Sequence, residues 1–168
     1  MGKNLLFVCT GNICRSPLAE VMARAYAAER GRDVEVLSAS VLGLDGLPAH
    51  KHSIKVAQEM GLDLRAHTAQ PVTEELVEWA DYILGMEIEH AAQLRGRFPQ
   101  ADEKILLLGT FGGVHEIEDP LGRWKPRFRA CRDLIRDCVE TFIDRLPKER
   151  SRPLRRGGPN VLFLPLFE

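Results

Sequence analysis

Residues 3–17 read KNLLFVCTGNICRSP, and this stretch decides the fold. Its apolar start has the length of a buried strand and ends abruptly in the letters TGN, which are typical of a loop. Pro17 then opens a stretch whose apolar residues recur at helical spacing as far as Tyr26. The sequence therefore predicts a strand, a tight loop and a helix in direct succession.

The same alternation continues along the chain. Apolar runs predict further strands over residues 34–37, 82–84 and 104–108, and helical spacing predicts helices over 48–60, 87–97 and 129–146, with a short helix capped by Thr73. Alternation of this kind is typical of an α/β fold. We expect a single-domain doubly wound sheet of about four parallel strands with helices on both faces. Ligands of such folds bind beyond the carboxyl ends of the strands, so the loop after the first strand is the first candidate site.

Length and composition limit the domain organisation and the partners. The chain has 168 residues and is 45% hydrophobic, which fits one domain. We expect that domain over residues 1–147, followed by a tail at 148–168 that is basic and then apolar and has no assigned role. The net charge of −1 offers no basic field for nucleic acid or an anionic membrane, so neither is an expected partner.

Neither a targeting segment nor a disulfide framework is predicted. The N-terminus lacks the apolar region of a signal peptide, and no apolar run approaches the roughly 18 residues of a membrane span, so we expect a cytoplasmic protein. Four cysteines without paired spacing predict reduced thiols. His50 and His52 form an isolated pair that we expect at the solvated surface. We therefore expect no metal and no cofactor.

The loop after the first strand carries the chemistry. Five residues separate Cys9 from Arg15, a spacing that can put a thiolate at the centre of a loop and a guanidinium at its closing edge. Gly11 and Asn12 tolerate positive φ, so the loop can aim its backbone N–H groups at one anion. A helix N-terminus also stabilises a thiolate, and Arg15 offers a bidentate fork to two phosphoryl oxygens.

The string from Cys9 to Pro17 resembles the signature of the low-molecular-weight protein tyrosine phosphatase family. Further segments follow in the family's order: Ser38-Ala39, His67, residues 73–86 and Asp119-Pro120. The resemblance covers about residues 3–146. It implies a phosphorylated protein or peptide as substrate, inorganic phosphate as product, and a covalent cysteinyl-phosphate intermediate on Cys9.

The resemblance also implies roles for individual residues. Asp119 is the expected general acid that protonates the leaving group and then the base that activates water. Cys14 is a second loop cysteine that can trap oxidised Cys9 as a disulfide. The expected phosphate-binding loop comprises Thr10, Gly11, Asn12, Ile13, Cys14, Arg15 and Ser16, and the expected supporting residues are Asn12, Ser16, Ser38 and His67. Cys131 and Cys138 lie on the apolar stripe of the last helix, where we expect them to pack.

Two substrate classes stay open. Tyrosine-specific members commonly carry aromatic residues after the second strand and after the Asp-Pro, where this chain has residues 41–47, rich in Leu, and Leu121. Trp124 could substitute as a wall for a phenyl ring. Thr10 and Leu121 resemble the protein arginine phosphatase branch instead, because tyrosine-directed members usually have an aliphatic residue after the nucleophile. Thr10, Leu121 and Trp124 are therefore the candidate specificity residues.

Two other function classes are weighed against a phosphatase. Thioredoxin-coupled arsenate reductases share this loop but relay a disulfide through mid-chain cysteines, and no Cys occurs between residues 15 and 130. A non-catalytic phosphoprotein-binding module would be favoured by loss of Cys9, Arg15 or Asp119, and all three are present.

Overall fold

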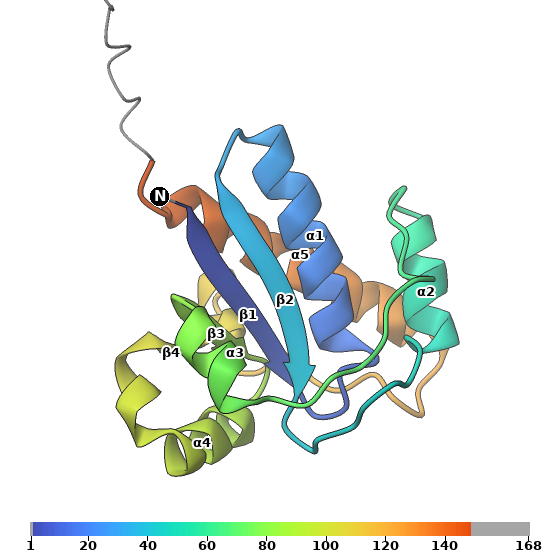
Figure 1. Cartoon of the computed structure of the whole chain (residues 1–168). Coiled ribbons are helices and arrows are strands. Elements are labelled where there is room, and N and C mark those ends of the chain that lie inside the picture. The colour runs from blue at the N-terminus through green and yellow to red at the C-terminus, as the bar shows by residue number, and fades with distance from the viewer. Residues whose placement is uncertain (1, 149–168) are drawn as a thin grey trace, which may run out of the picture.

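The computed structural model describes residues 2–148, and its centre is a sheet of four parallel strands (Figure 1). The strand order is β2-β1-β3-β4. The strands are β1 (Lys3–Cys9), β2 (Val34–Ser40), β3 (Tyr82–Gly85) and β4 (Ile105–Leu107). The tail expected beyond residue 148 lies outside the described residues.

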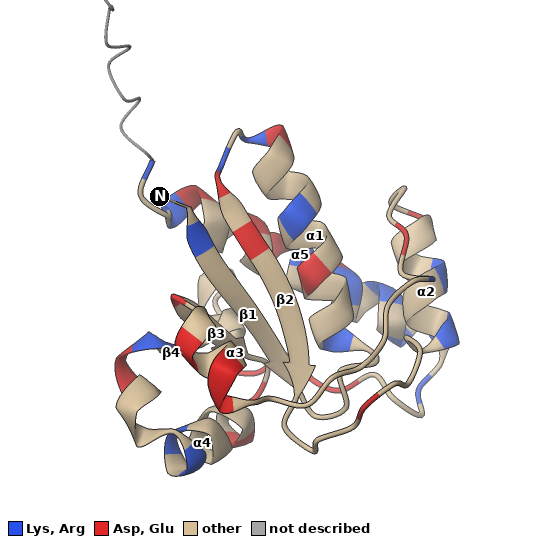
Figure 2. Cartoon of the chain, viewed as in Figure 1, with Lys and Arg blue, Asp and Glu red and all other residues tan. Residues whose placement is uncertain are grey.

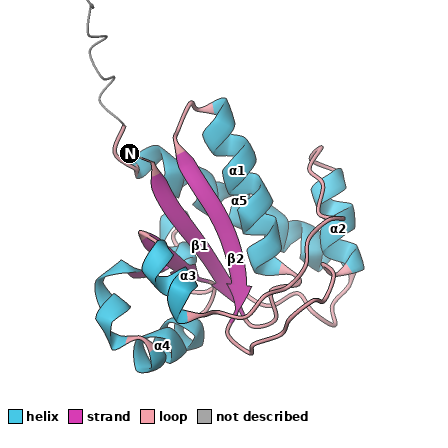
Figure 3. Ribbon diagram, viewed as in Figure 1, coloured by secondary structure: helices cyan, strands magenta, loops and turns pink. Residues whose placement is uncertain are grey.

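Helices cover both faces of the sheet, as predicted for a doubly wound α/β fold (Figure 3). The five α-helices are α1 (Arg15–Glu29), α2 (Lys51–Gln58), α3 (Glu74–Trp79), α4 (Ile88–Arg97) and α5 (Lys125–Arg145). In Figure 1, α1 and α5 lie behind one face of the sheet, and α3 and α4 lie on the other. Basic and acidic side chains are interspersed over these helices (Figure 2).

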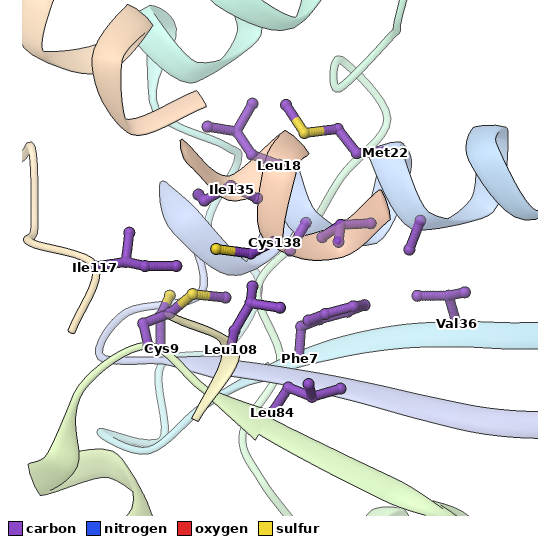
Figure 4. Close-up of a cluster of buried hydrophobic side chains, with 14 of the residues drawn as sticks. Phe7, Cys9, Leu18, Met22, Val36, Leu84, Leu108, Ile117, Ile135 and Cys138 are labelled. Atoms are coloured by element: carbon purple, nitrogen blue, oxygen red, sulfur yellow. The ribbon is translucent and has the colours of Figure 1, made fainter. Parts of the chain in front are cut away.

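Strand β1 is buried on both faces, as is usual for the central strand of a parallel sheet. Leu5 and Phe7 belong to the core cluster that includes α1 and α5, whereas Leu6 and Val8 belong to the cluster on the opposite face. Cys9 follows the alternation of Leu5 and Phe7 and so lies on the α1 and α5 face. Figure 4 shows Cys9 at one end of this cluster. The core therefore fixes the direction of the Cys9 side chain.

The strand order creates a switch point beside β1. Strand β1 pairs with β2 on one side and with β3 on the other, so the connections that leave β1 and β3 run in opposite directions across the sheet. A crevice opens at such a point, beyond the carboxyl ends of the strands. The loop after β1 and the residues after β3 therefore face the same space.

Several predicted boundaries of helices and strands were wrong. The helix predicted over 48–60 begins at Lys51, because Pro48 forms an isolated bridge with Thr68. Helix α5 begins at Lys125 instead of residue 129, with a proline in its first turn, a position that suits proline. Strand β2 extends to Ser40, and the 3₁₀ helices Pro99–Lys104 and Leu108–Gly112 were not predicted.

The sequence predicted His50 and His52 at the solvated surface, but both side chains pack against Phe128. The rings of His50 and His52 each lie 5.0 Å from the ring of Phe128, and His50 Nδ1 accepts the backbone N–H of His52 at the start of α2. Within residues 2–148 no group of three or more His, Cys, Asp or Glu side chains is placed to hold a metal ion. No helix in the same range is long and apolar enough to cross a membrane.

Candidate active site

The loop between β1 and α1 is held in its conformation by Asn12. With a φ of 55°, Asn12 is the one non-glycine residue in the left-handed region among residues 2–148, and its side chain is fully buried. Its Nδ2 donates to Ser16 Oγ at 2.8 Å and to Ser38 Oγ at 2.9 Å, and its Oδ1 accepts the backbone N–H of Gln70 at 3.0 Å. These bonds satisfy a buried amide and offset the cost of the left-handed backbone.

His67 holds the same residue from the main-chain side. Its Nε2 lies 2.8 Å from the carbonyl oxygen of Asn12, and because a carbonyl can only accept, Nε2 carries the proton. Ser38 Oγ donates in turn to Glu20 Oε1 at 3.2 Å. The structure thus brings together the four expected supporting residues and adds Glu20 and Gln70, which the sequence analysis missed.

The Cys9 sulfur lies at the mouth of this loop, in front of α1. Sγ is 2.9 Å from Ser16 Oγ and accepts the backbone N–H of Asn12 at 3.3 Å. Helix α1 begins at Arg15, so its positive end is directed toward the loop. A hydroxyl, a backbone N–H and the N-terminus of α1 therefore surround this sulfur.

Arg15 stands where the loop ends and α1 begins, and its side chain is buried. Its side chain is 1% exposed, and its Nη1 donates to the carbonyl oxygen of Ile117 at 2.8 Å. Among the described residues, Arg15 Nε is the buried side-chain N or O atom that lacks a hydrogen-bond partner. Leaving such a donor unsatisfied costs about 1–3 kcal/mol, so the site is built to receive an acceptor there.

Asp119 approaches Arg15 from the loop that precedes α5. Its Oδ2 lies 3.5 Å from Arg15 Nη2, and its Oδ1 accepts the backbone N–H of Leu121 at 3.0 Å. Asp119 also lines a cleft of about 540 Å³ together with Glu87, Pro120 and Cys131. The lining of this cleft does not include Cys9 or Arg15, so the contact with Arg15 is what connects Asp119, more than 100 residues away in sequence, to the loop of Cys9.

Of the three candidate specificity residues, Leu121 and Trp124 are exposed, whereas Thr10 is partly buried in the site. Leu121 is 50% exposed and Trp124 is 87% exposed, and neither belongs to the lining of the cleft beside Asp119. Thr10 points into the site, where its Oγ1 lies 2.9 Å from His90 Nε2 and accepts from Arg15 Nη2 at 3.4 Å. The oxygen of the Thr10 hydroxyl thus has two hydrogen-bond partners within the protein, His90 and Arg15.

Glu87 and His90 are site residues that the sequence analysis missed. Glu87 Oε2 lies 3.4 Å from Arg15 Nη1 and 3.3 Å from His90 Nε2. Both residues follow the end of β3, and Cys9 is the last residue of β1. The switch-point rule, applied to the predicted strand at 82–84, is the signal that would have found them.

All four cysteines are free, and three have raised pKa values. Burial raises the pKa of Cys14 and that of Cys131 to about 12 and the pKa of Cys138 to about 11. Cys131 and Cys138 belong to the core cluster, where their helical spacing predicted them. These three groups are therefore thiols at neutral pH.

Comparisons with known proteins agree on one family. The family model described as "Low molecular weight phosphotyrosine protein phosphatase" matches residues 4–152. The chain is 37% identical over 151 residues to a protein-arginine-phosphatase of Geobacillus stearothermophilus, covering 89% of this chain and 97% of that one. It is 34% identical over 146 residues to the low molecular weight protein-tyrosine-phosphatase Etp of Escherichia coli K12, covering 87% and 96%.

A solved structure of a similar protein has the same fold. It is a Cys-to-Ser mutant of the YwlE arginine phosphatase with a phosphorylated active-site serine. The TM-score is 0.82 at 32% sequence identity, over 88% of this chain and 97% of that one. The likeness extends over nearly the whole of both chains.

Proposed function

Because this chain belongs to the low molecular weight phosphotyrosine protein phosphatase family, we propose that Cys9 is the nucleophile with which it dephosphorylates proteins. The enzyme is a protein phosphatase of the class that acts on phosphotyrosine or phosphoarginine. The observation that carries the assignment to this loop is the unpartnered, buried Arg15 Nε beside the Cys9 loop. A phosphoryl oxygen is the acceptor that suits this donor, because guanidinium groups bind phosphate through paired N–H groups.

The first step transfers the phosphoryl group to the protein. Cys9 Sγ attacks phosphorus, an S–P bond forms, and the bond from phosphorus to the side-chain oxygen or nitrogen breaks. Asp119 donates a proton to the departing atom, which leaves poorly as an anion. Arg15 and the loop amides hold the phosphoryl oxygens while charge redistributes.

The second step releases phosphate. Asp119, now ionised, removes a proton from a water molecule that attacks phosphorus. The S–P bond breaks, which returns Cys9 as the thiolate and yields inorganic phosphate. The contact of Asp119 with Arg15 in the present structure fits this cycle. A bound phosphoryl group competes with Asp119 for Arg15 and so releases the carboxyl toward the leaving group.

The surroundings of the loop are compatible with phosphotyrosine and with phosphoarginine, and the similar proteins include phosphatases of both kinds. A side-chain carbon at Gly11 would lie 3.4 Å from Leu44, and the backbone N–H of Leu42 donates to the Thr10 carbonyl, so leucines cover this part of the loop. Leu42 and Leu121 are exposed apolar side chains next to the loop and next to Asp119-Pro120. Thr10, the residue that resembled the arginine branch, is bonded to His90 and Arg15.

Side-by-side assays on matched phosphoarginine and phosphotyrosine peptides decide between the two substrates. We expect the wild type to hydrolyse the phosphoarginine peptide measurably, because Thr10 and Leu121 resemble the arginine branch. Thr10→Ile should shift the ratio of kcat/KM toward the phosphotyrosine peptide by about tenfold or more, the discrimination that a pocket change of this size typically contributes. The same peptide backbone should be used for both, with release of inorganic phosphate as the readout. A wild type that ignores phosphoarginine, with the ratio unmoved by Thr10→Ile, would assign the chain to the tyrosine-specific class, and it would leave the role of Cys9 intact.

Cys14 is proposed to protect the nucleophile from irreversible oxidation. Peroxide oxidises the Cys9 thiolate to a sulfenic acid and is reduced to water. The Cys14 thiol then displaces water from that sulfenic acid to form a disulfide, which a dithiol reduces. The four free thiols also support the expected cytosolic location, since disulfides are rare there.

Recovery from peroxide tests the role of Cys14. We expect wild-type enzyme to regain most of its activity after treatment with peroxide and then dithiothreitol. The Cys14→Ala variant should lose most of this recovery, because its sulfenic acid oxidises further. Cys131→Ala is the matched control, since Cys131 is another buried thiol whose pKa burial raises, and it should recover like the wild type. Equal recovery of the Cys14 and Cys131 variants would rule out the protective disulfide.

A further inference from the structure

His90 is a buried side chain that the two-step mechanism does not use. It lies in the first turn of α4 and is 2% exposed. A side-chain carbon at Gly85 would lie 3.3 Å from His90 Cβ, so the glycine at the end of β3 makes room for this ring. Its position at the switch point sets it directly against the catalytic loop.

The hydrogen bonds of the ring fix its tautomer. The backbone N–H of Glu87 donates to Nδ1 at 3.1 Å, so Nδ1 carries a lone pair and the proton of a neutral ring is on Nε2. Burial and the positive charge of Arg15 lower the pKa of His90 to about 4, so the ring is neutral at physiological pH. The charged groups around it are Arg15, Glu87, Glu89 and Asp119.

The tautomer determines what Thr10 can do. His90 Nε2–H donates to Thr10 Oγ1 at 2.9 Å, and Arg15 Nη2 reaches the same oxygen at 3.4 Å. Two donors occupy the two lone pairs of the hydroxyl oxygen, so the hydroxyl proton has to be donated elsewhere. Thr10 is half-buried and follows the nucleophile directly, so an oxygen bound beside Arg15 is within the reach of its side chain.

We propose that the Thr10 hydroxyl donates a hydrogen bond to a phosphoryl oxygen and that His90 is the positioning residue that fixes this orientation. The inference rests on the proposed function, since it concerns the same site. His90 touches no reacting atom. It acts by occupying an acceptor site of Thr10 and so turning the hydroxyl into a donor toward the phosphate.

Two matched pairs of variants separate this role from simple packing. His90→Gln keeps an N–H at the place of Nε2 and an oxygen that can accept the Glu87 N–H, as glutamine does at this position of a capping box. His90→Asn can reach Glu87 but not Thr10. In the loop, Thr10→Ser keeps the hydroxyl, whereas Thr10→Val replaces it with a methyl group of similar size.

Turnover of para-nitrophenyl phosphate and the affinity for inorganic phosphate are the two readouts. We expect His90→Asn and Thr10→Val each to lower kcat/KM and phosphate affinity by about three- to tenfold, the usual effect of one hydrogen bond. His90→Gln and Thr10→Ser should stay within about twofold of the wild type. The double variant Thr10→Val/His90→Asn should be no worse than Thr10→Val alone, because both remove the same hydrogen bond.

The outcomes test the role of His90 separately from the proposed phosphatase function. The inference would be overturned if the losses of the two single variants multiply in the double variant. It would also be overturned if His90→Gln is as impaired as His90→Asn at equal thermal stability. If His90→Asn does not fold, equal behaviour of Thr10→Ser and Thr10→Val would overturn it. An inactive wild type whose phosphate affinity still follows the expected pattern would refute the proposed function and leave the inference supported.

Discussion

Cys9→Ser will abolish turnover and leave the fold intact. An alcohol is far less acidic than a thiol, and the helix N-terminus and Arg15 cannot ionise it at neutral pH. We expect kcat to fall by at least about a thousandfold, as is usual when a nucleophile is removed. The side chain is 2% exposed and oxygen is smaller than sulfur, so thermal unfolding should change little. Hydrolysis of para-nitrophenyl phosphate measures the loss.

Mass spectrometry adds a direct test of the covalent step. In the similar YwlE mutant an active-site serine is phosphorylated, so the introduced hydroxyl here should slowly acquire one phosphoryl group at residue 9. Cys131→Ser is the control, since it removes a thiol that lines the cleft without touching the loop, and it should keep near wild-type activity. Residual turnover above a few per cent in the Cys9 variant would contradict the covalent mechanism.

Asp119→Asn will have the second largest effect, and its size will depend on the leaving group. The asparagine keeps the shape of the side chain but cannot donate the proton. A positioned acid contributes about 10² to 10⁴ in rate, and it contributes most when the leaving group is most basic. We expect a loss in that range for an alkyl or peptide phosphotyrosine substrate and a much smaller loss for para-nitrophenyl phosphate.

A series of aryl phosphates measures this dependence as a slope. For the Asp119 variant, kcat/KM should fall steeply as the leaving group becomes more basic, and for the wild type it should change little. Glu118→Gln is the matched control, because Glu118 is the neighbouring carboxylate in the same cleft. Equal losses on good and poor leaving groups would remove Asp119 from the role of acid.

The part of this molecule that sequence predicts best is the part encoded locally. Residues 3–17 contain a buried strand, the loop and the helix start in one continuous stretch, so apolar spacing and loop residues suffice to place Cys9 and Arg15. Helix boundaries were less accurate where a long-range contact decides them. Pro48 forms an isolated β-bridge with Thr68, and no local sequence pattern predicts that pairing.

The residues that the sequence did not predict come from segments outside the loop: Glu87 and His90 follow β3, and Gln70 precedes α3. His90, Glu87 and Gln70 carry no signature of their own, and each becomes meaningful only when the sheet brings it beside the loop. The register that aligns Val8 with Gly85 is what sets His90 against Thr10. Thr10 illustrates the converse: its departure from the tyrosine-specific pattern is explained by a partner 80 residues away.

Asn12 joins the catalytic loop to β2, to α1 and to the segment at Gln70 while it lies fully buried. Such a loop cannot open by itself, since opening would leave several buried polar groups without partners. Opening this loop therefore costs the free energy of several buried hydrogen bonds, and the Asn12 amide, whose N–H is bonded to Cys9 Sγ, should exchange slowly with solvent hydrogen. In kinetic terms, we expect the conformation of the loop at Asn12 to persist for as long as the native domain does.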